Sequence, residues 1–474
     1  MTPPSARRKS PAVAAILSFI FPGLGHLYLR RFRSAVIYAL PVVGLIVLIG
    51  VRIMSDGIDV LGLEMFSPSL SLTVLGIVVV LGLWWAIALV DAFNVAGGRR
   101  PWRPLSTTIA TALVLVIVAV TSFSAYSAWN LYDAGQHIFV ASGPDDRFGQ
   151  TPPATLSPGE TPNGSPTPFA SDPGFADATP LTTPAPGSTR ITVLLTGIDS
   201  SPTRNHALND SMIVASLDTA TGKLSMVSFA RDIAGFKLWD GRTFSGKINS
   251  LMSTAQADPK GYPLGGMNTV VKELSYLLGI PVDYYAAVNL PGFTKLVDAA
   301  GGVTVHNDTV IDDPSYGGWT DKRPVGFHLG VGTHTLDGQG ALAFARSRMG
   351  PGNNDFVRAR RQQQLILALE KKLTSPEMLA RLPDVIQALG KTVRTNYPAD
   401  GLAQALEAAR KVDESATTRV VLGPPYAVRS NDASTYSLDL DMSKLAALSV
   451  KLFGSDSAYW TPPPSPSTRP STSP

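Results

Sequence analysis

The sequence predicts an α/β domain whose central mixed sheet is covered by helices on both faces, preceded by an all-α membrane segment. Two observations carry this prediction. Residues 1–132 are strongly apolar, whereas residues 190–460 alternate short β-branched runs with helical patterns. Between them, residues 133–189 are rich in Pro, Thr, Ser and Gly, which predicts an extended linker. Residues 461–474 have the same composition and are predicted to form a disordered tail.

The N-terminal segment contains three apolar stretches of membrane-spanning length, at about 34–54, 69–93 and 104–128. A fourth stretch, 11–29, is interrupted by proline and glycine and has basic residues on both flanks, so we expect it to be re-entrant or interfacial. Basic residues also precede 104–128, whereas the loop after 34–54 is acidic. The positive-inside rule therefore predicts a multi-pass protein of the cytoplasmic membrane with its C-terminal domain outside the cell.

The net charge of +4 is unevenly distributed along the chain. The first 104 residues hold ten of the 40 Lys and Arg and four of the 36 Asp and Glu, so the remainder carries thirty basic and thirty-two acidic residues. The basic excess therefore belongs to the membrane flanks, and we expect no nucleic acid partner. The absence of cysteine excludes disulfides and cysteine-ligated metal sites.

Residues 190–460 begin with a short apolar run that predicts a buried strand ending at Asp199. Residues 211–218 and 223–232 then predict an antiparallel hairpin. Further along, the patterns predict helices at 265–278 and 292–302, strands at 284–290 and 303–307, two helices within 376–412 and a late strand at 419–425. Ligands of such sheets bind at the carboxyl ends of strands, where Asp199 and Arg231 are expected.

The stretch from Gly340 to Gln364 contains five arginines. Arg346 and Arg348 are two residues apart, so in extended backbone their side chains point the same way. After a Gly/Pro/Asn turn the pattern becomes helical and places Asp355, Arg358 and Gln362 on one helix face. Three guanidinium groups would then point into one small volume, an arrangement that suits phosphate oxygens. The alternative is a solvated helix start held by salt bridges.

Seven motifs occur in order along this domain: TGIDS, NDSMIV, SFARD, GKIN, AGGVTV, ALAFARSR and DFVRARRQQQ. In this order they resemble the LytR-CpsA-Psr (LCP) family, over about residues 190–375. The resemblance implies an LCP-like catalytic domain at 190–460, in a membrane-anchored enzyme that faces the cell wall. The implied activity is transfer of a glycopolymer from a polyprenyl-pyrophosphate carrier to peptidoglycan through a phosphodiester bond. The implied partners are that lipid-linked glycopolymer, peptidoglycan and membrane lipid.

The resemblance also implies a role for each motif residue. The expected catalytic residues are Arg231, Arg346, Arg348, Arg358 and Asp355. The expected substrate-binding residues are Lys247, Asn249, Arg361 and Gln362, with Arg361 facing the pocket and Arg360 solvated. Asp199 and Asp210 are expected to bind Mg²⁺ or Mn²⁺. Asp199, Asp210 and Asp355 all remain candidates for the base that accepts the hydroxyl proton.

One departure from the family pattern bears on function. Leu208 stands two residues before Asp210, where the family usually has arginine. This departure favours a non-catalytic regulator that binds cell-wall polymer, and a polyprenyl-pyrophosphate pyrophosphatase without an acceptor is a second alternative to glycopolymer transfer. The apolar stretch 274–293 is expected to be core, and by the resemblance part of it could instead line a groove for the polyprenyl chain.

Overall fold

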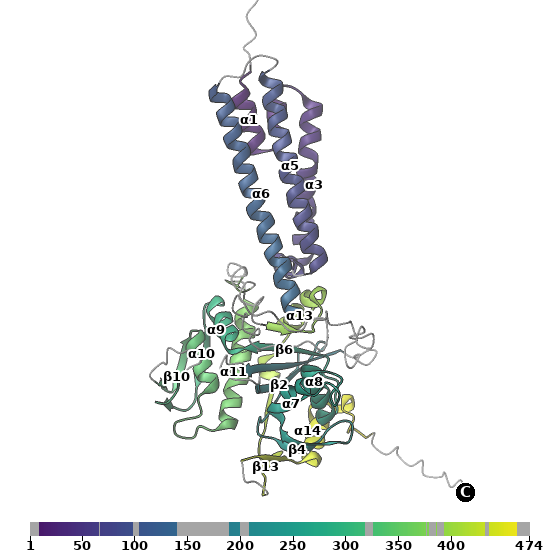
Figure 1. Cartoon of the computed structure of the whole chain (residues 1–474), viewed down its shortest axis with the longest axis vertical. Helices are drawn as coiled ribbons and strands as arrows, with labels where there is room; N and C mark the ends of the chain where they lie inside the picture. Colours follow the sequence, from purple (N-terminus) through teal and green to yellow (C-terminus); the bar gives the residue numbers. More distant parts are fainter. Residues whose placement is uncertain are drawn as a thin grey trace, which may run out of the picture. The chain divides into compact units, whose positions relative to one another are not determined.

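The computed structural model describes residues 9–65, 67–97, 104–139, 189–199, 208–317, 326–375, 377–378, 385, 393–431 and 436–461. Nearly all of the predicted linker and tail therefore lies outside the described residues. The chain divides into an N-terminal helical unit, Met1–Gln136 with Pro398–Ala403, and a C-terminal α/β unit made of the remaining residues. Figure 1 labels the elements of both units.

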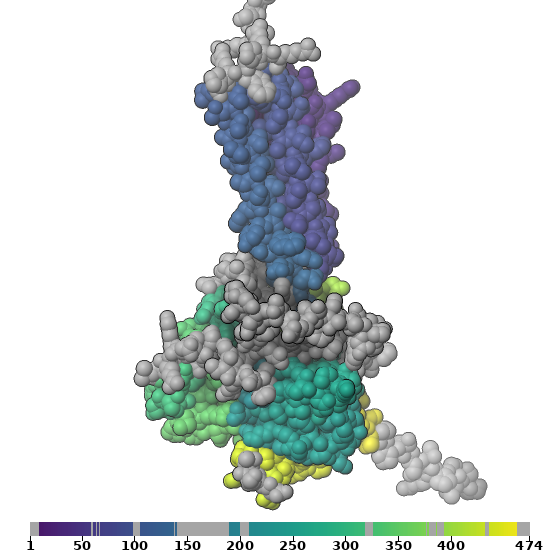
Figure 2. All heavy atoms as spheres, in the orientation of Figure 1, coloured from purple at the N-terminus to yellow at the C-terminus, as the bar shows by residue number. Residues whose placement is uncertain are grey.

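The N-terminal unit consists of helices α1 (Pro11–Ile20), α2 (Leu24–Tyr28), α3 (Phe32–Asp56), α4 (Ile58–Glu64), α5 (Pro68–Gly97) and α6 (Pro104–Ile138). Helices α3, α5 and α6 are long and apolar enough to cross a membrane, and they contain the three predicted spans. Helix α6 continues beyond residue 133, where the linker was predicted to start, because no proline ends it there. On the face shown in Figure 2 these helices form a closely packed bundle.

The first apolar stretch, 11–29, is broken into two short helices. Gly23 has a φ of 96°, and a Cβ built there would lie 2.3 Å from the carbonyl oxygen of Ala35. Glycine is therefore required at the break between α1 and α2. Ten residues of α1 extend about 15 Å, which is half of a hydrocarbon core. Neither short helix can cross a membrane by itself.

The C-terminal unit is built on a six-stranded mixed sheet with the order β11-β6-β1-β2-β3-β12. These strands are β1 (Arg190–Asp199), β2 (Leu208–Asp218), β3 (Leu224–Phe229), β6 (Tyr284–Asn289), β11 (Val393–Thr395) and β12 (Thr418–Leu422). Strands β2 and β3 form the predicted antiparallel hairpin. Strand β1 is antiparallel to β2 and parallel to β6, and β12 is parallel to β3.

Helices cover both faces of this sheet, as predicted. One face packs Met212 and Val214 of β2 against α7 (Leu251–Ala257), α8 (Gly266–Leu278) and α14 (Met442–Phe453). The opposite face packs Ile213 of β2 and Met226 of β3 against Leu367 of α11 (Asp355–Leu373). Neighbouring residues of one strand thus enter opposite cores, which is the period of two that strands impose. The stretch 274–293 contributes buried residues to the first of these cores.

The remaining elements lie around the central sheet. Strand β7 (Val303–Asn307) was predicted correctly but pairs with β10 (Gly332–Leu336) in a separate sheet. That sheet shares a core with α9 (Leu290–Ala299) and α10 (Gly338–Arg346). The others are β4 (Ala234–Lys237), β5 (Thr243–Lys247), β8 (Ile311–Asp313), β9 (Phe327–Leu329), α13 (Leu402–Arg410), β13 (Ala427–Arg429), β14 (Leu438–Leu440) and short 3₁₀ turns at Ile248–Ser250, Ala399–Gly401, Glu414–Ala416 and Gly454–Asp456.

Candidate active site

One edge of the central sheet gathers the polar residues that end or begin its strands. Strands β1, β3 and β12 run in the same direction, so their carboxyl ends meet there, and the antiparallel β2 begins there. Asp199 is the last residue of β1, Asp210 is the third of β2, and Arg231 follows β3 by two residues. The chain topology therefore places these three side chains at one edge, as the sequence predicted for Asp199 and Arg231.

Two helices bring the other arginines to this edge. Helix α10 ends at Arg346, so the expectation that Arg346 lies in extended backbone is wrong. The Asp337 side chain caps this helix by accepting a hydrogen bond from the Gly340 amide, and the alanine-rich sequence continues it to Arg346. Ser347 is the first extended residue after the helix. Asn354 caps α11, and Asp355 begins it.

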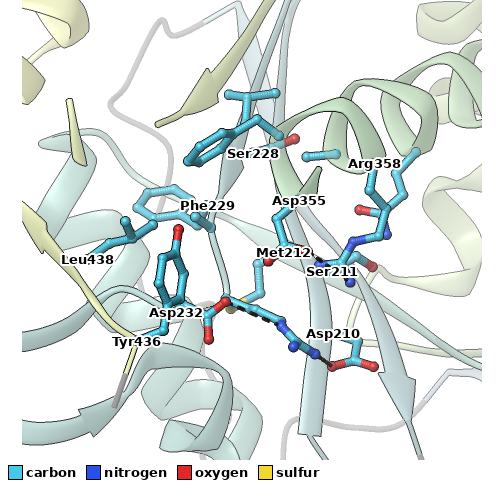
Figure 3. A pocket seen from close by; sticks show the side chains of 16 residues that line it. Asp210, Ser211, Met212, Ser228, Phe229, Asp232, Asp355, Arg358, Tyr436 and Leu438 are labelled. Carbon is cyan, nitrogen blue, oxygen red and sulfur yellow. Dashed lines mark hydrogen bonds and ion pairs between the residues drawn. The ribbon is translucent and has the colours of Figure 1, made fainter. Parts of the chain in front are cut away.

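The four predicted arginines line a single cavity of about 450 Å³. Its described lining residues are Asp199, Asp210, Arg231, Asp313, Ser315, Tyr316, Gly317, Ala345, Arg346, Arg348, Met349, Arg358 and Gln362. A smaller adjoining pocket shares Asp210, Arg231, Arg358 and Gln362 and adds Asp355. Figure 3 shows this pocket, with Asp355 and Arg358 from α11 on one side and Asp210 and Asp232 on the other. We call the larger space the arginine cavity.

Carboxylates compensate the arginine charges across the cavity. Arg346 Nη2 lies 3.5 Å from Asp199 Oδ2, and Arg231 Nη1 lies 3.3 Å from Asp210 Oδ1. The two carboxylates in these pairs are the candidate metal ligands. Both distances are longer than the 2.7–2.9 Å of a tight charge-assisted hydrogen bond.

Asp355 connects two of the arginines. Its Oδ1 lies 2.9 Å from Arg348 Nε and 3.7 Å from Arg358 Nη1. Arg358 is 6% exposed, and its Nε has no hydrogen-bond partner among the described residues. Burial, together with the nearby charge of Arg348, lowers the pKa of Arg358 to about 10. A guanidinium that is buried, still protonated at neutral pH and incompletely bonded is prepared to donate to phosphate oxygens.

The expected substrate-binding residues lie at different places around the cavity. Gln362 lines it, one helical turn after Arg358. Lys247 does not line it, but its Nζ donates to Asp232 Oδ1 at 2.5 Å, and Asp232 Oδ2 lies 3.5 Å from Arg231 Nε. Lys247 therefore acts on Arg231 through Asp232. Asn249 is buried in the 3₁₀ turn Ile248–Ser250, outside the lining.

The expectation that Arg361 faces the arginine cavity is not met. Arg361 is buried, its guanidinium carbon lies 5.4 Å from the centre of the Phe344 ring, and its Nη2 donates to the Ser347 carbonyl at 2.6 Å. Three residues of helix rotate it by about 300° from Arg358, whereas the four residues to Gln362 bring that side chain back to the same face. Arg361 thus positions the segment between Arg346 and Arg348. Arg360 is exposed, as expected.

Asp232 is a structural partner within this network. Burial alone would raise the pKa of Asp232, but the hydrogen bond from Lys247 and the charge of Arg231 hold it below its usual range. Asp232 is therefore ionised at neutral pH. Its negative charge holds the Arg231 side chain at the edge of the sheet where the carboxyl ends of the strands meet.

Sequence reasoning missed several residues of the site. Tyr316 lines the arginine cavity, and burial raises the pKa of its phenol. Asp313 accepts a hydrogen bond from Ser347 Oγ at 2.8 Å and so fixes the segment between Arg346 and Arg348. Tyr436 lines the adjoining pocket from a loop 63 residues beyond the end of α11 at Leu373. The DDPSY run at 312–316 is a polar strand end that could have signalled the first two, but no pattern in the sequence points to Tyr436.

The donor set of the cavity fits a divalent cation held together with substrate phosphates. No group of three or more His, Cys, Asp or Glu side chains with metal-site geometry occurs in the described part of the chain. Asp199 and Asp210 line the same cavity, and Mg²⁺ commonly uses one or two carboxylates, several waters and phosphate oxygens. The protein thus offers a partial site that an anionic substrate would complete.

Together, the mixed sheet and its flanking helices place four guanidinium groups and two strand-end carboxylates around one cavity. The LytR_cpsA_psr family model matches residues 177–451, which is more than half of the chain, and the chain belongs to this family.

The chain is also similar to individual curated relatives and solved structures. Over 210 residues the chain is 32% identical to the polyisoprenyl-teichoic acid–peptidoglycan teichoic acid transferase TagU of Bacillus mycoides, covering 44% of this chain and 61% of the relative. It is 28% identical over 214 residues to the biofilm regulatory protein A of Streptococcus mutans, covering 43% and 49%. The chain thus covers less than two thirds of the length of each of these two curated relatives. Among solved structures, the crystal structure of B. subtilis TagV aligns with 58% of this chain and 99% of its own at 22% identity and a TM-score of 0.46.

Proposed function

We propose that this protein is a phosphotransferase that attaches a polyprenyl-pyrophosphate-linked glycopolymer to peptidoglycan through a phosphodiester bond. The observation that carries the proposal is the arginine cavity, where Arg231, Arg346, Arg348 and Arg358 surround a space bordered by Asp199 and Asp210. Family membership supports it, as do the names of relatives that transfer polyisoprenyl-linked teichoic acid to peptidoglycan.

The arginines suit the charge changes of this reaction. A hydroxyl of the acceptor attacks the phosphorus that carries the glycopolymer, a new P–O bond forms, and the bond to the bridging oxygen breaks to release polyprenyl phosphate. Negative charge grows on the leaving oxygens as that bond breaks. Guanidinium groups already fixed around those oxygens stabilise the transition state more than the ground state. Arg358 is buried, and its Nε has no hydrogen-bond partner within the described ranges, so it provides such a fixed donor.

The carboxylates have two tasks in this proposal. Asp199 and Asp210 would bind a Mg²⁺ or Mn²⁺ ion, which would supply further positive charge next to the pyrophosphate. The hydroxyl proton passes to one of the cavity carboxylates, with Asp199, Asp210 and Asp355 as the candidates named from the sequence. In the structure Asp199 and Asp210 pair with Arg346 and Arg231. The pyrophosphate would take over these arginines and leave the two carboxylates available.

The charges that flank the long apolar helices support a location in the cytoplasmic membrane with the α/β unit outside. Basic residues precede α3 and lie between α5 and α6, whereas Asp56 ends α3 and Glu64 ends α4, before α5 begins. Basic loops stay in the cytoplasm, so α3 runs outward, α5 returns, and α6 carries the following chain out of the cell. The short helices α1 and α2 would form the re-entrant or interfacial element. This orientation places the arginine cavity on the side of the wall polymer and membrane lipid.

The proposal is tested with the purified full-length chain, a polyprenyl-pyrophosphate-linked oligosaccharide and peptidoglycan fragments. We expect sugar to become linked to peptidoglycan through phosphodiester, and polyprenyl phosphate to be released in equal amount. Release of phosphate that does not depend on peptidoglycan would instead identify a pyrophosphatase. Binding of polymer with neither product would identify a regulator, the alternative that Leu208 favours.

A further inference from the structure

A second polar cavity, of about 550 Å³, lies on the C-terminal unit and has a different lining from the arginine cavity. It is formed by α11, the edge strand β12 and the turn that follows β7, and we call it the β12 groove. None of its described lining residues lines the arginine cavity. Its volume is within the range of small-molecule sites, about 300–1,000 Å³. The groove is thus a separate feature that the proposed reaction does not use.

The β12 groove is strongly basic. Three guanidinium groups line it, those of Arg360, Arg361 and Arg419, against the single carboxylate of Asp308. Asp308 is already 3.6 Å from His306 Nε2. Arg360 and Arg419 are exposed, and neither forms an ion pair with any residue that the structure describes. The positive charge of the groove is therefore not compensated from within this part of the chain.

Arg361 is a second, independent observation that points to an anionic ligand. It is 5% exposed, and of its donors only Nη2 is bonded, to the Ser347 carbonyl. Its Nε and Nη1 are buried and have no hydrogen-bond partner among the described residues. Burial, with the nearby charge of Arg358, lowers the pKa of Arg361 to about 10, so it remains charged at neutral pH. A buried cation with two unbonded donors is costly unless an anion joins it.

We propose that the β12 groove binds phosphodiester groups of an anionic polymer, and that it holds the transferred glycopolymer at a second point away from its pyrophosphate end. Planar guanidinium groups match phosphate oxygens in pairs, and a buried arginine beside two exposed ones suits phosphates in series along a flexible chain. No Phe, Tyr or Trp is among the described lining residues, so the groove lacks the stacking platform of a nucleic-acid site. Naming the transferred polymer as the ligand rests on the proposed function.

The groove is also linked to the arginine cavity through one residue. Arg361 donates to the carbonyl of Ser347, whose neighbours Arg346 and Arg348 line the arginine cavity. Ser347 is held on its other side by Asp313. A phosphate bound at Arg361 would thus contact the side chain that holds the backbone between Arg346 and Arg348. We expect occupancy of the groove to favour the arrangement in which these two arginines meet the pyrophosphate.

The test measures binding of an oligo(glycerol phosphate) that carries no lipid and no pyrophosphate to the full-length protein in detergent, by calorimetry. The groove variant combines Arg360→Gln and Arg419→Gln, and the matched control combines Lys237→Gln and Lys451→Gln. All four side chains are exposed, and both variants lose two positive charges. We expect the groove variant to bind the oligomer at least about ten-fold more weakly than the wild type, and the control to bind within about two-fold of it.

Other ligands separate the possible sources of the anion. Inorganic pyrophosphate reports on the arginine cavity, and both variants should bind it like the wild type. Equal oligomer affinity in the groove variant and the control would overturn the proposal. If inorganic phosphate displaces the oligomer when both supply the same concentration of phosphate groups, the groove binds a free ion. The assignment of a polymer as its ligand would then be wrong. If the groove variant binds the oligomer more weakly but the wild type transfers no polymer, the proposed function is wrong and the assignment of the groove as a phosphodiester-binding site is supported.

Discussion

Replacement of Arg348 by alanine should lower the rate of transfer by roughly 10²–10³ without unfolding the protein. The Arg348 side chain is 37% exposed and contacts Asp355 through Nε at 2.9 Å. Burial, together with the charge of Arg231, lowers the pKa of its guanidinium, and the carboxylates of Asp355 and Asp210 oppose this shift. In the proposed reaction Arg348 would donate to oxygens whose charge increases in the transition state.

We expect Arg348→Ala to have a large effect on the rate of transfer and a small effect on stability. Loss of one fixed donor to a developing oxyanion costs about 2.7–4 kcal/mol, or roughly 10²–10³ in rate. The ion pair with Asp355 is partly solvated, and Asp355 keeps Arg358 Nη1 at 3.7 Å. We therefore expect Arg348→Ala to lower the free energy of unfolding by about 1 kcal/mol or less.

The assay compares initial rates of polymer transfer and thermal unfolding for the wild type, Arg348→Ala and Lys237→Ala. Lys237 is exposed on β4 and does not line the arginine cavity, so its replacement controls for the loss of one positive charge. Transfer by Arg348→Ala within about three-fold of the wild type would refute this reasoning. Equal loss of rate in Lys237→Ala would show that net charge, and not the site, is responsible.

Three further predictions concern the metal, the core and the membrane. Asp199→Asn with Asp210→Asn should lower transfer by at least about 100-fold and remove its dependence on Mg²⁺, while pyrophosphate still binds without metal; unchanged transfer would contradict the assignment of Asp199 and Asp210 as metal ligands. Burial raises the pKa of Glu273 to about 8, against 4.5 in the unfolded chain, so the wild type should lose stability as the pH rises between these values. Glu273→Gln should then equal the wild type in urea unfolding near pH 4.5 and exceed it by about 3–5 kcal/mol above pH 8; a difference independent of pH would contradict this. Because the chain has no cysteine, Ala220→Cys should react with an impermeant maleimide on intact cells and Gly98→Cys only after lysis; the reverse would place the arginine cavity in the cytoplasm.

Much of the fold follows from local patterns in the sequence. The hairpin of β2 and β3, the helix at Gly266–Leu278 and the long apolar helices were all predicted, because burial on one or both faces leaves a clear period. Pairing between distant segments leaves no such trace. Strand β7 was therefore found, but its partner β10, in a separate sheet, was not.

The same distinction applies to the site. The strand-end residues Asp199 and Arg231 and the helix face of Arg358 and Gln362 were predicted from position alone, and the structure brings them together. The local geometry of Arg346 was wrong because two arginines separated by one residue fit an extended strand and a helix end equally well. Arg361 was predicted to face the wrong cavity because a residue three positions after Arg358 lies about 60° away from it around the helix axis, far enough to face the β12 groove instead. Tyr436 comes from a distant loop and could be found only from the folded chain.

The central claim is that four guanidinium groups from three separate segments bind one pyrophosphate. A crystal structure of the protein soaked with a polyprenyl pyrophosphate and Mg²⁺ tests it most directly. We expect pyrophosphate oxygens within hydrogen-bond distance of Arg231, Arg346, Arg348 and Arg358, with the cation on Asp199 or Asp210. A pyrophosphate bound elsewhere, with the ion pair between Arg346 and Asp199 still in place, would contradict the account.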